Sequence, residues 1–227
     1  MRINFKKYQL PRLPSATLAI ALVCVLLRVM QVIVARAPVR SALMQGDAGS
    51  YLLVPDILTF LFSIHGLGLS LKFFWTPVTY IFLHDSATHL ALNIAGLLAF
   101  GTMLEREFGK RVMLGSFLVS GIIGGLGWVA FRGLDSMQPC VGASAAVLGV
   151  IGAYAALRPK EEFELAIPFF RTHIRVWELA VFLVVANALE LFFGRGNIAY
   201  SAHLFGIVSG GVCGLLARRF GSKTRQL

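Results

Sequence analysis

Long apolar runs separated by short polar segments set the pattern of this chain of 227 residues. A helix needs about 20 consecutive apolar residues to cross a bilayer, with a range of roughly 17 to 25. The six runs of that length cover residues 13–35, 81–103, 112–131, 141–157, 176–193 and 198–217. The pattern therefore predicts an all-α membrane protein whose six transmembrane helices form one bundle.

The polar, basic ends of the chain divide it into three parts. Residues 1–12 and 218–227 are predicted to be cytoplasmic tails, and residues 13–217 to be one membrane domain. The first apolar run follows basic residues, as the apolar region of a signal peptide does. It is too long for such a region, and no small-residue cleavage site follows it. We therefore expect it to be retained as a transmembrane helix.

The longest connection between runs, residues 36–80, is predicted to lie outside. Its apolar pieces are too short to span a membrane and are interrupted by Pro55 and Pro77. We expect an interfacial or partly inserted loop with Trp75 and Tyr80 at the level of the lipid headgroups. Such a loop either packs on the bundle or forms a lateral barrier beside a site, and both readings stay open. Residues 158–175 are expected to be a polar cytoplasmic linker with a short amphipathic piece at 166–170.

The charge of the chain is best explained by its topology. Only 14% of the residues are charged, against roughly 25% in soluble domains, so a soluble protein is excluded. The formal net charge of +10 could by itself indicate a nucleic-acid partner. Most of the 21 Lys and Arg residues, however, lie in the two tails and in the connections on the same side of the bundle. This distribution predicts cytoplasmic N and C termini, and the partner it indicates is the lipid bilayer, not nucleic acid.

Two polar residues stand inside Gly-rich apolar runs: Ser144 near the start of the fourth run and His203 near the start of the sixth. Polar groups are costly in hydrocarbon, so such residues are functional candidates. A hydroxyl and an imidazole are also the nucleophile and the base of a serine hydrolase. Both runs enter the membrane from the outer side in the predicted topology. At about 1.5 Å per residue, both side chains then lie within roughly 10 Å of the outer boundary.

The second run adds His89 and Asn93, spaced i, i+4 on one helix face and at the same depth. Both side chains can donate hydrogen bonds to an oxyanion, as can the backbone N–H of Ser144 near a helix N-terminus. Small residues allow helix backbones to approach closely. The small residues predicted to support this site are Gly142, Ala145, Gly206 and Gly210.

Three cysteines offer little alternative chemistry. Cys140 lies four residues before Ser144 and is therefore a rival nucleophile, but nothing near it in sequence would lower its pKa. Cys24 and Cys213 fall inside apolar runs, where a free thiol behaves as a small hydrophobe. No spacing of Cys and His is typical of a metal site, so we predict neither a metal nor another cofactor.

Together these residues resemble the motifs of the rhomboid family of intramembrane serine proteases. The resemblance covers about residues 75–214, in the family's order along the chain. No single motif is decisive, but four in register are strong. The motif residues are His84, His89 and Asn93; Gly101, Glu105 and Gly109; Gly142, Ser144 and Ala145; and Ala202, His203, Gly206 and Gly210.

The resemblance implies a protease with a Ser–His dyad that lacks a carboxylate. Ser144 would attack a peptide carbonyl, His203 would act as general base, and Asn93 and His89 would hold the oxyanion. The implied substrates are single-span membrane proteins, cut in or near their transmembrane segment. The implied location is a bacterial inner (plasma) membrane, with the site toward the outer face.

Two further motif residues are expected to have structural roles. Glu105, near the inner end of the second run, is expected to brace cytoplasmic loops by pairing with Arg106, Lys110 or Arg111. His84, at the mouth of that run, is expected to order the loop through hydrogen bonds and not to act as a base.

Three positions depart from the family pattern. Ala145 replaces a glycine, and Thr76 follows Trp75 where the family has arginine. Leu148 replaces an aromatic residue that stacks on the histidine, so His203 must be oriented by something else. No catalytic atom is lost, so the protease is preferred over two alternatives. One is an inactive rhomboid-like protein that binds membrane-protein clients; the other is a small transporter or channel, which would need paired charges at mid-membrane.

Overall fold

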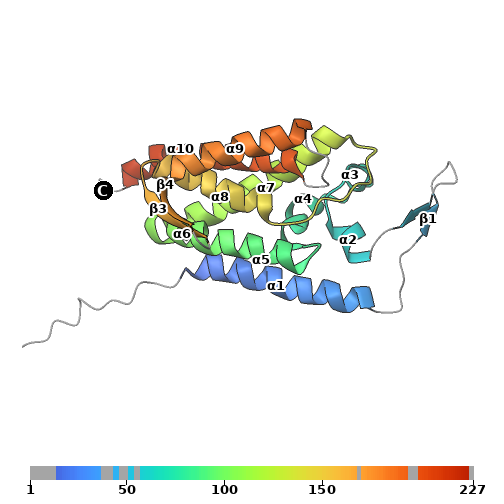
Figure 1. Ribbon diagram of the computed structural model, residues 1–227. Coiled ribbons are helices and arrows are strands. Elements are labelled where there is room, and N and C mark those ends of the chain that lie inside the picture. The colour runs from blue at the N-terminus through green and yellow to red at the C-terminus, as the bar shows by residue number, and fades with distance from the viewer. Residues whose placement is uncertain are drawn as a thin grey trace, which may run out of the picture.

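Helices make up most of the chain in the computed structural model, which describes residues 14–36, 43–45, 51–53, 57–167, 170–193 and 199–224. They lie side by side, with α1 along one side of the bundle and α9 along the other (Figure 1). Within the described residues, five helices are long and apolar enough to cross a membrane. These are α1 (Ser15–Arg36), the continuous helix Ala87–Phe108, α7 (Lys110–Arg132), α9 (Val176–Phe193) and α10 (Tyr200–Thr224).

The fourth apolar run forms a shorter helix than we predicted. Helix α8 (Ser144–Leu157) has 14 residues, about 21 Å of helix against the roughly 30 Å of a bilayer's hydrocarbon core. The expected start at residue 141 is wrong because Gly142 has a φ of +122°, outside the helical region. Helix α8 contacts α7, α9 and α10, so it lies within the bundle. The count of six spans therefore stays a prediction.

The second run also begins its helix later than predicted. Tyr80–Phe82 is a separate 3₁₀ turn (η2), and the long helix consists of α5 (Ala87–Gly96), a π-helical turn η3 (Leu97–Gly101) and α6 (Thr102–Phe108). Ser86 caps α5, because its Oγ accepts a hydrogen bond of 3.1 Å from the backbone N–H of His89. The cap places His89 in the first turn of the helix.

Three short helices order the connection before the second run: α2 (Ile57–Phe62), α3 (Gly66–Ser70) and α4 (Thr76–Thr79). Further upstream, β1 (Leu43–Gln45) and β2 (Tyr51–Leu53) pair as antiparallel strands. The remaining residues between 37 and 56 lie outside the described part of the chain, so the predicted membrane insertion of this loop is untested there.

The two aromatic residues predicted at headgroup level lie in different environments. Trp75 is 45% exposed, as an interfacial residue would be. The prediction for Tyr80 is wrong, because its side chain is buried and its hydroxyl donates a hydrogen bond of 2.6 Å to the carbonyl of Gly121. A Cβ on Gly125 would lie 2.6 Å from the Tyr80 ring, so the glycine makes room for the ring.

The linker after α8 contains strands, which the all-α prediction did not include. Strands β3 (Glu162–Ile167) and β4 (Phe170–Arg175) pair antiparallel, with Glu162 opposite Arg175. Charged and apolar residues alternate along 162–165, which is the period of a strand. The predicted amphipathic piece at 166–170 falls at the end of this hairpin and lies partly outside the described residues.

Glu105 does not make the predicted pairs with cytoplasmic basic residues. Its carboxylate accepts hydrogen bonds from the backbone N–H groups of Ala16 (3.0 Å) and Thr17 (2.8 Å) and from the Thr17 hydroxyl (2.7 Å). These groups belong to the first turn of α1, whose N–H groups have no partner within the helix. A carboxylate is favourable at a helix N-terminus, so Glu105 on α6 ties that end of α1 to the bundle.

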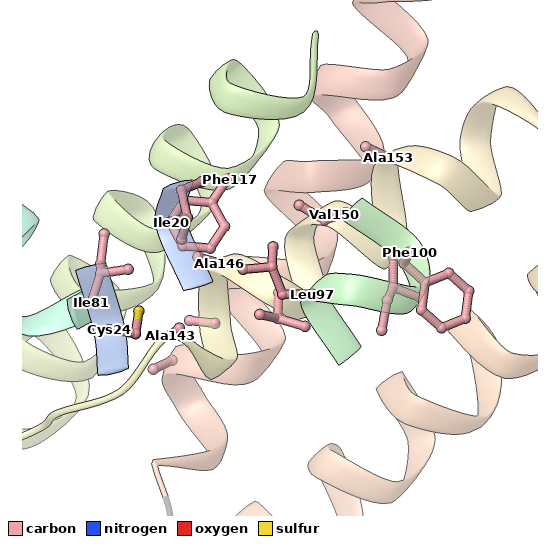
Figure 2. Packing of buried hydrophobic residues seen from close by; sticks show 14 of the residues in the cluster. Ile20, Cys24, Ile81, Leu97, Phe100, Phe117, Ala143, Ala146, Val150 and Ala153 are labelled. Atoms are coloured by element: carbon pink, nitrogen blue, oxygen red, sulfur yellow. The ribbon is translucent and has the colours of Figure 1, made fainter. Parts of the chain in front are cut away.

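Glycines bring α8 and α10 into backbone contact. A Cβ on Gly206 would overlap the carbonyl of Ala145, and a Cβ on Gly210 would overlap the backbone of Gly149. Elsewhere α8 packs small side chains against larger ones, such as Phe117 on α7 (Figure 2). This packing holds the first turn of α8 beside the first turn of α10.

Replacing Gly210 by alanine is expected to lower the free energy of unfolding by about 1–3 kcal/mol, the usual cost of overpacking a tight interior. The added methyl group must displace the backbone of Gly149. Gly211→Ala is the matched control, because its methyl group would meet the Gly152 carbonyl at an ordinary 3.9 Å. Thermal unfolding in detergent micelles measures both variants, and equal stability of the two would contradict this packing.

Candidate active site

The helix packing brings Ser144 and His203 together. Ser144 is the first residue of α8, and His203 lies in the first turn of α10. The Ser144 Oγ and the His203 Nε2 are 2.7 Å apart, a short hydrogen-bond distance. The two side chains that the topology predicted at one level are thus in direct contact.

Asn187 on α9 holds the other side of the His203 ring, and our sequence reasoning missed it. Its Oδ1 lies 2.8 Å from the His203 Nδ1. The Tyr200 ring also meets the His203 ring edge-on, with centroids 6.2 Å apart. Asn187 and Tyr200 thus orient the His203 ring, which Leu148 cannot do because it has no aromatic ring to stack on it. The signal was present in sequence, since Asn187 is an amide inside the apolar run 176–193.

His89 is oriented by Asp85, which was not among the predicted site residues. The His89 Nδ1 lies 2.8 Å from the Asp85 Oδ1, a contact that the i, i+4 spacing could have suggested. Burial raises the pKa of Asp85, but hydrogen bonds from His89 and Ser86 and the charge of His89 outweigh burial and lower it overall. Asp85 is therefore ionised at neutral pH.

The chain passes close beneath the His89 ring at Gly142. A Cβ on Gly142 would lie 2.5 Å from the Cε1 and 2.7 Å from the Nε2 of His89. The φ of +122° at Gly142 is also one that residues with a side chain rarely adopt. Glycine is therefore required here, both for the backbone conformation and for the close approach of the His89 ring to the chain just before Ser144.

Asn93 has a buried side-chain donor that is unused among the described residues. It is 7% exposed, and its Nδ2 finds no hydrogen-bond partner in the part of the chain that the structure describes. A buried amide without a partner is unfavourable. Such a group is available to a ligand that enters the site.

A cavity of about 460 Å³ connects these groups. Four polar side chains on its wall can take part in acyl transfer: a hydroxyl, the imidazole beside it and two further donors. The residues that line it include Ser144, His203, His89, Asn93, Leu92 and Trp128. The arrangement can therefore activate a hydroxyl nucleophile and stabilise an oxyanion.

The methyl group of Ala145, the departure beside Ser144, faces α7. A Cβ placed on Gly124 would lie 2.6 Å from the Cβ of Ala145. Glycine at 124 therefore makes room for the larger residue at 145, on the side of α8 that packs against α7.

Cys140 is not suited to be the nucleophile. Its backbone pairs with Ile64 through hydrogen bonds of 2.9 and 3.1 Å, and its side chain is buried. Burial raises the pKa of the Cys140 thiol to about 12. A thiol reacts as the thiolate, which is scarce at neutral pH when the pKa is so high.

His84 orders its loop through its backbone instead of its ring. Its carbonyl accepts a hydrogen bond of 3.0 Å from Arg28 Nη1, and its N–H donates one of 3.1 Å to Gln31 Oε1. Its ring nitrogens have no hydrogen-bond partner among the described residues. The ring packs edge-on against His89, with centroids 5.2 Å apart. The expected hydrogen bonding thus exists but links the mouth of α5 to α1.

No group of three or more His, Cys, Asp or Glu side chains that could hold a metal ion occurs within the described residues. The polar groups at the cavity are those of acid–base and nucleophilic chemistry.

Comparison with known proteins identifies the family. The family model described as a Rhomboid domain matches residues 72–220. This range is well over half of the chain, and the chain belongs to the rhomboid family. The family resemblance of the sequence motifs is thereby confirmed. With five helices of membrane-spanning length among the described residues, the protein is a multi-pass integral membrane protein.

The relatives differ in how much of their length the chain covers. It is 33% identical over 148 residues to the putative rhomboid protease YdcA of Bacillus subtilis, which is 64% of this chain and 68% of that protein. It is 31% identical over 138 residues to the rhomboid protease GluP of the same organism, or 60% and 24% of the two chains. It is 29% identical over 148 residues to the mitochondrial rhomboid protein 1 of Saccharomyces cerevisiae, or 64% and 42%. The chain thus spans about two thirds of the first relative and less than half of the other two.

Proposed function

We propose that this protein is an intramembrane serine endopeptidase that cuts the transmembrane segments of single-span membrane proteins with a Ser–His dyad. The observation that carries the proposal is the 2.7 Å contact between the Ser144 Oγ and the His203 Nε2 at the wall of a cavity. Relatives whose names call them rhomboid proteases support it.

In the first step, the Ser144 Oγ attacks the peptide carbonyl carbon while the His203 Nε2 takes its proton. The carbonyl oxygen becomes an oxyanion, and His203 then donates its proton to the leaving amine as the C–N bond breaks. Water, deprotonated by His203, attacks the acyl-enzyme. Loss of the Ser144 alkoxide, reprotonated by His203, releases the carboxylate product.

Three donors would hold the oxyanion. The Asn93 Nδ2 is unpartnered within the described residues, and the backbone N–H of Ser144 lies at the N-terminus of α8. His89 is the third. Its Nδ1 faces Asp85, and its Nε2 can donate to the oxyanion when the ring carries both protons.

The location of the protein completes the proposal. The three helices that carry the site, α5, α8 and α10, each place it near their N-terminal ends. With α8 added to the five longer helices as a span, and with both basic tails in the cytoplasm, the site lies toward the outer face of a bacterial inner membrane. The loop at 36–80 would then lie on the same side as the site.

A fluorophosphonate probe tests whether Ser144 is an activated nucleophile. Purified protein in lipid is expected to react with the probe, with the adduct mapped to Ser144 by mass spectrometry. Cys140→Ala, which removes the neighbouring thiol, is expected to label as wild type does. A folded wild-type protein that stays unlabelled and yet binds single-span proteins would favour the alternative, an inactive rhomboid-like protein that binds clients.

A further inference from the structure

A chain of three hydrogen bonds runs from the backbone of α9 to Ser144. The Asn187 Nδ2 donates to the carbonyl of Leu183, one turn earlier on the same helix, at 2.8 Å. The Asn187 Oδ1 lies 2.8 Å from the His203 Nδ1, and the His203 Nε2 lies 2.7 Å from the Ser144 Oγ. These hydrogen bonds thus link α9, α10 and α8, with the His203 imidazole in the middle.

The carbonyl of Leu183 determines which group donates and which accepts in each of these three hydrogen bonds. A backbone carbonyl can only accept, so the Asn187 amide nitrogen must face Leu183 and its oxygen must face His203. An amide oxygen also only accepts, so the proton of the neutral ring must sit on Nδ1. The lone pair of the ring then lies on Nε2, facing the hydroxyl of Ser144.

The surroundings of Asn187 make this contact notable. Helix α9 is apolar, and side chains on its outer face such as Val185, Leu189 and Phe192 are half or more exposed. An amide in such a segment is costly unless it is hydrogen-bonded. The Asn187 amide makes hydrogen bonds to its own helix and to His203, so it is placed where it can hold the imidazole ring.

We propose that Asn187 is a positioning residue that keeps His203 in the tautomer able to accept the proton of Ser144. The inference rests on the proposed function and deepens it, because it replaces a two-residue dyad by a Ser–His–Asn arrangement. Without the Asn187 oxygen, the ring proton can sit on Nε2, and that tautomer cannot take a proton from Ser144. The amide still accepts from Nδ1 when the ring becomes an imidazolium, so it holds the ring throughout the reaction.

Two substitutions at this position separate hydrogen bonding from packing. Asn187→Leu keeps the size of the side chain and removes the acceptor; Asn187→Asp keeps the acceptor and adds a charge. Val185→Ala, on the exposed outer face of the same helix, is the matched control. The three variants are compared with wild type in lipid vesicles for kcat, KM and the pH dependence of kcat/KM.

Asn187→Leu is expected to lower kcat about 10- to 100-fold, the effect of losing one hydrogen bond to a group that becomes charged, while KM stays within about twofold. Asn187→Asp is expected to retain cleavage, with the acid limb of its pH profile moved up by roughly one unit. The sign follows because a carboxylate stabilises the protonated ring, so His203 becomes free to act as base only at higher pH. Val185→Ala is expected to behave as wild type.

A merely structural role would leave kcat of a folded Asn187→Leu protein close to that of wild type, so a fall in kcat at unchanged KM decides the inference. Wild-type kcat in Asn187→Leu would overturn it. If Asn187→Leu does not fold, an unshifted profile in Asn187→Asp would overturn it instead. If wild type is active and the Asn187 variants have its kcat and pH profile, this inference alone is wrong. If wild type neither cleaves nor reacts with fluorophosphonate, the proposed function is wrong as well.

Discussion

Replacing His203 by alanine is expected to lower kcat for a single-span substrate by at least about a thousandfold, since removal of one member of a nucleophile–base unit costs nearly as much as removal of the whole unit. The reason is the 2.7 Å contact through which His203 would take the Ser144 proton. Initial rates at saturating substrate in lipid vesicles measure the effect. The rate of fluorophosphonate labelling is expected to fall in parallel.

The control for this variant is His173→Ala. His173 is an exposed histidine on the β4 strand, outside the bundle core, and its removal is expected to leave kcat within about twofold. A His203→Ala protein that folds and retains more than a tenth of wild-type kcat would contradict the assignment of His203 as the base.

Replacing Asn93 by leucine is expected to lower kcat by about 10²–10³-fold with little change in KM, the usual effect of losing one oxyanion donor. The Asn93 Nδ2 makes no hydrogen bond within the described residues, so its contribution would arise only when an oxyanion forms. Removing a buried, unpartnered amide also relieves an unfavourable burial. The unfolding temperature of Asn93→Leu is therefore expected to equal or exceed that of wild type.

Loss of activity without loss of stability is the outcome that distinguishes an oxyanion donor from a structural residue. Asn93→Asp is the matched variant, because it keeps the size of the side chain and replaces the donor by a carboxylate. That charge would repel the oxyanion, so its kcat is expected to fall at least as far. Near wild-type kcat in a folded Asn93→Leu protein would exclude Asn93 as an oxyanion donor.

The meeting of Ser144 and His203 could be predicted because it depends on topology more than on detailed packing. Apolar runs give the order of the helices, and alternating direction through the bundle puts the starts of α8 and α10 at the same end. The glycines of those two helices then allow the close approach. Both signals are local in the sequence, so both could be read from it.

The partners of the two histidines could not be predicted with the same certainty. Asp85 is four residues from His89, and that spacing was a local signal. Asn187 reaches His203 from another helix. Which face of α9 points into the bundle cannot be read from the sequence, because almost all of its residues are apolar and show no helical periodicity. For such a segment, the lone polar residue is the better guide.

The errors at Tyr80 and Glu105 have a related cause. A tyrosine at the end of an apolar run is typical of a membrane interface, but Gly121 and Gly125 on α7 create a buried place for Tyr80. Glu105 has basic neighbours in sequence, but the unpaired N–H groups at the start of α1 lie close to it in space. In both cases a contact between distant segments outweighs the local pattern.

Cleavage of a single-span membrane protein in lipid vesicles, by wild type and by Ser144→Ala side by side, is the most direct test of the central claim. Wild type is expected to yield two fragments with a cut in or near the transmembrane segment, and Ser144→Ala to yield none over the same period. Equal cleavage by the two proteins would show that Ser144 is not the nucleophile. A wild type that binds such substrates and leaves them intact would show that the protein is not a protease.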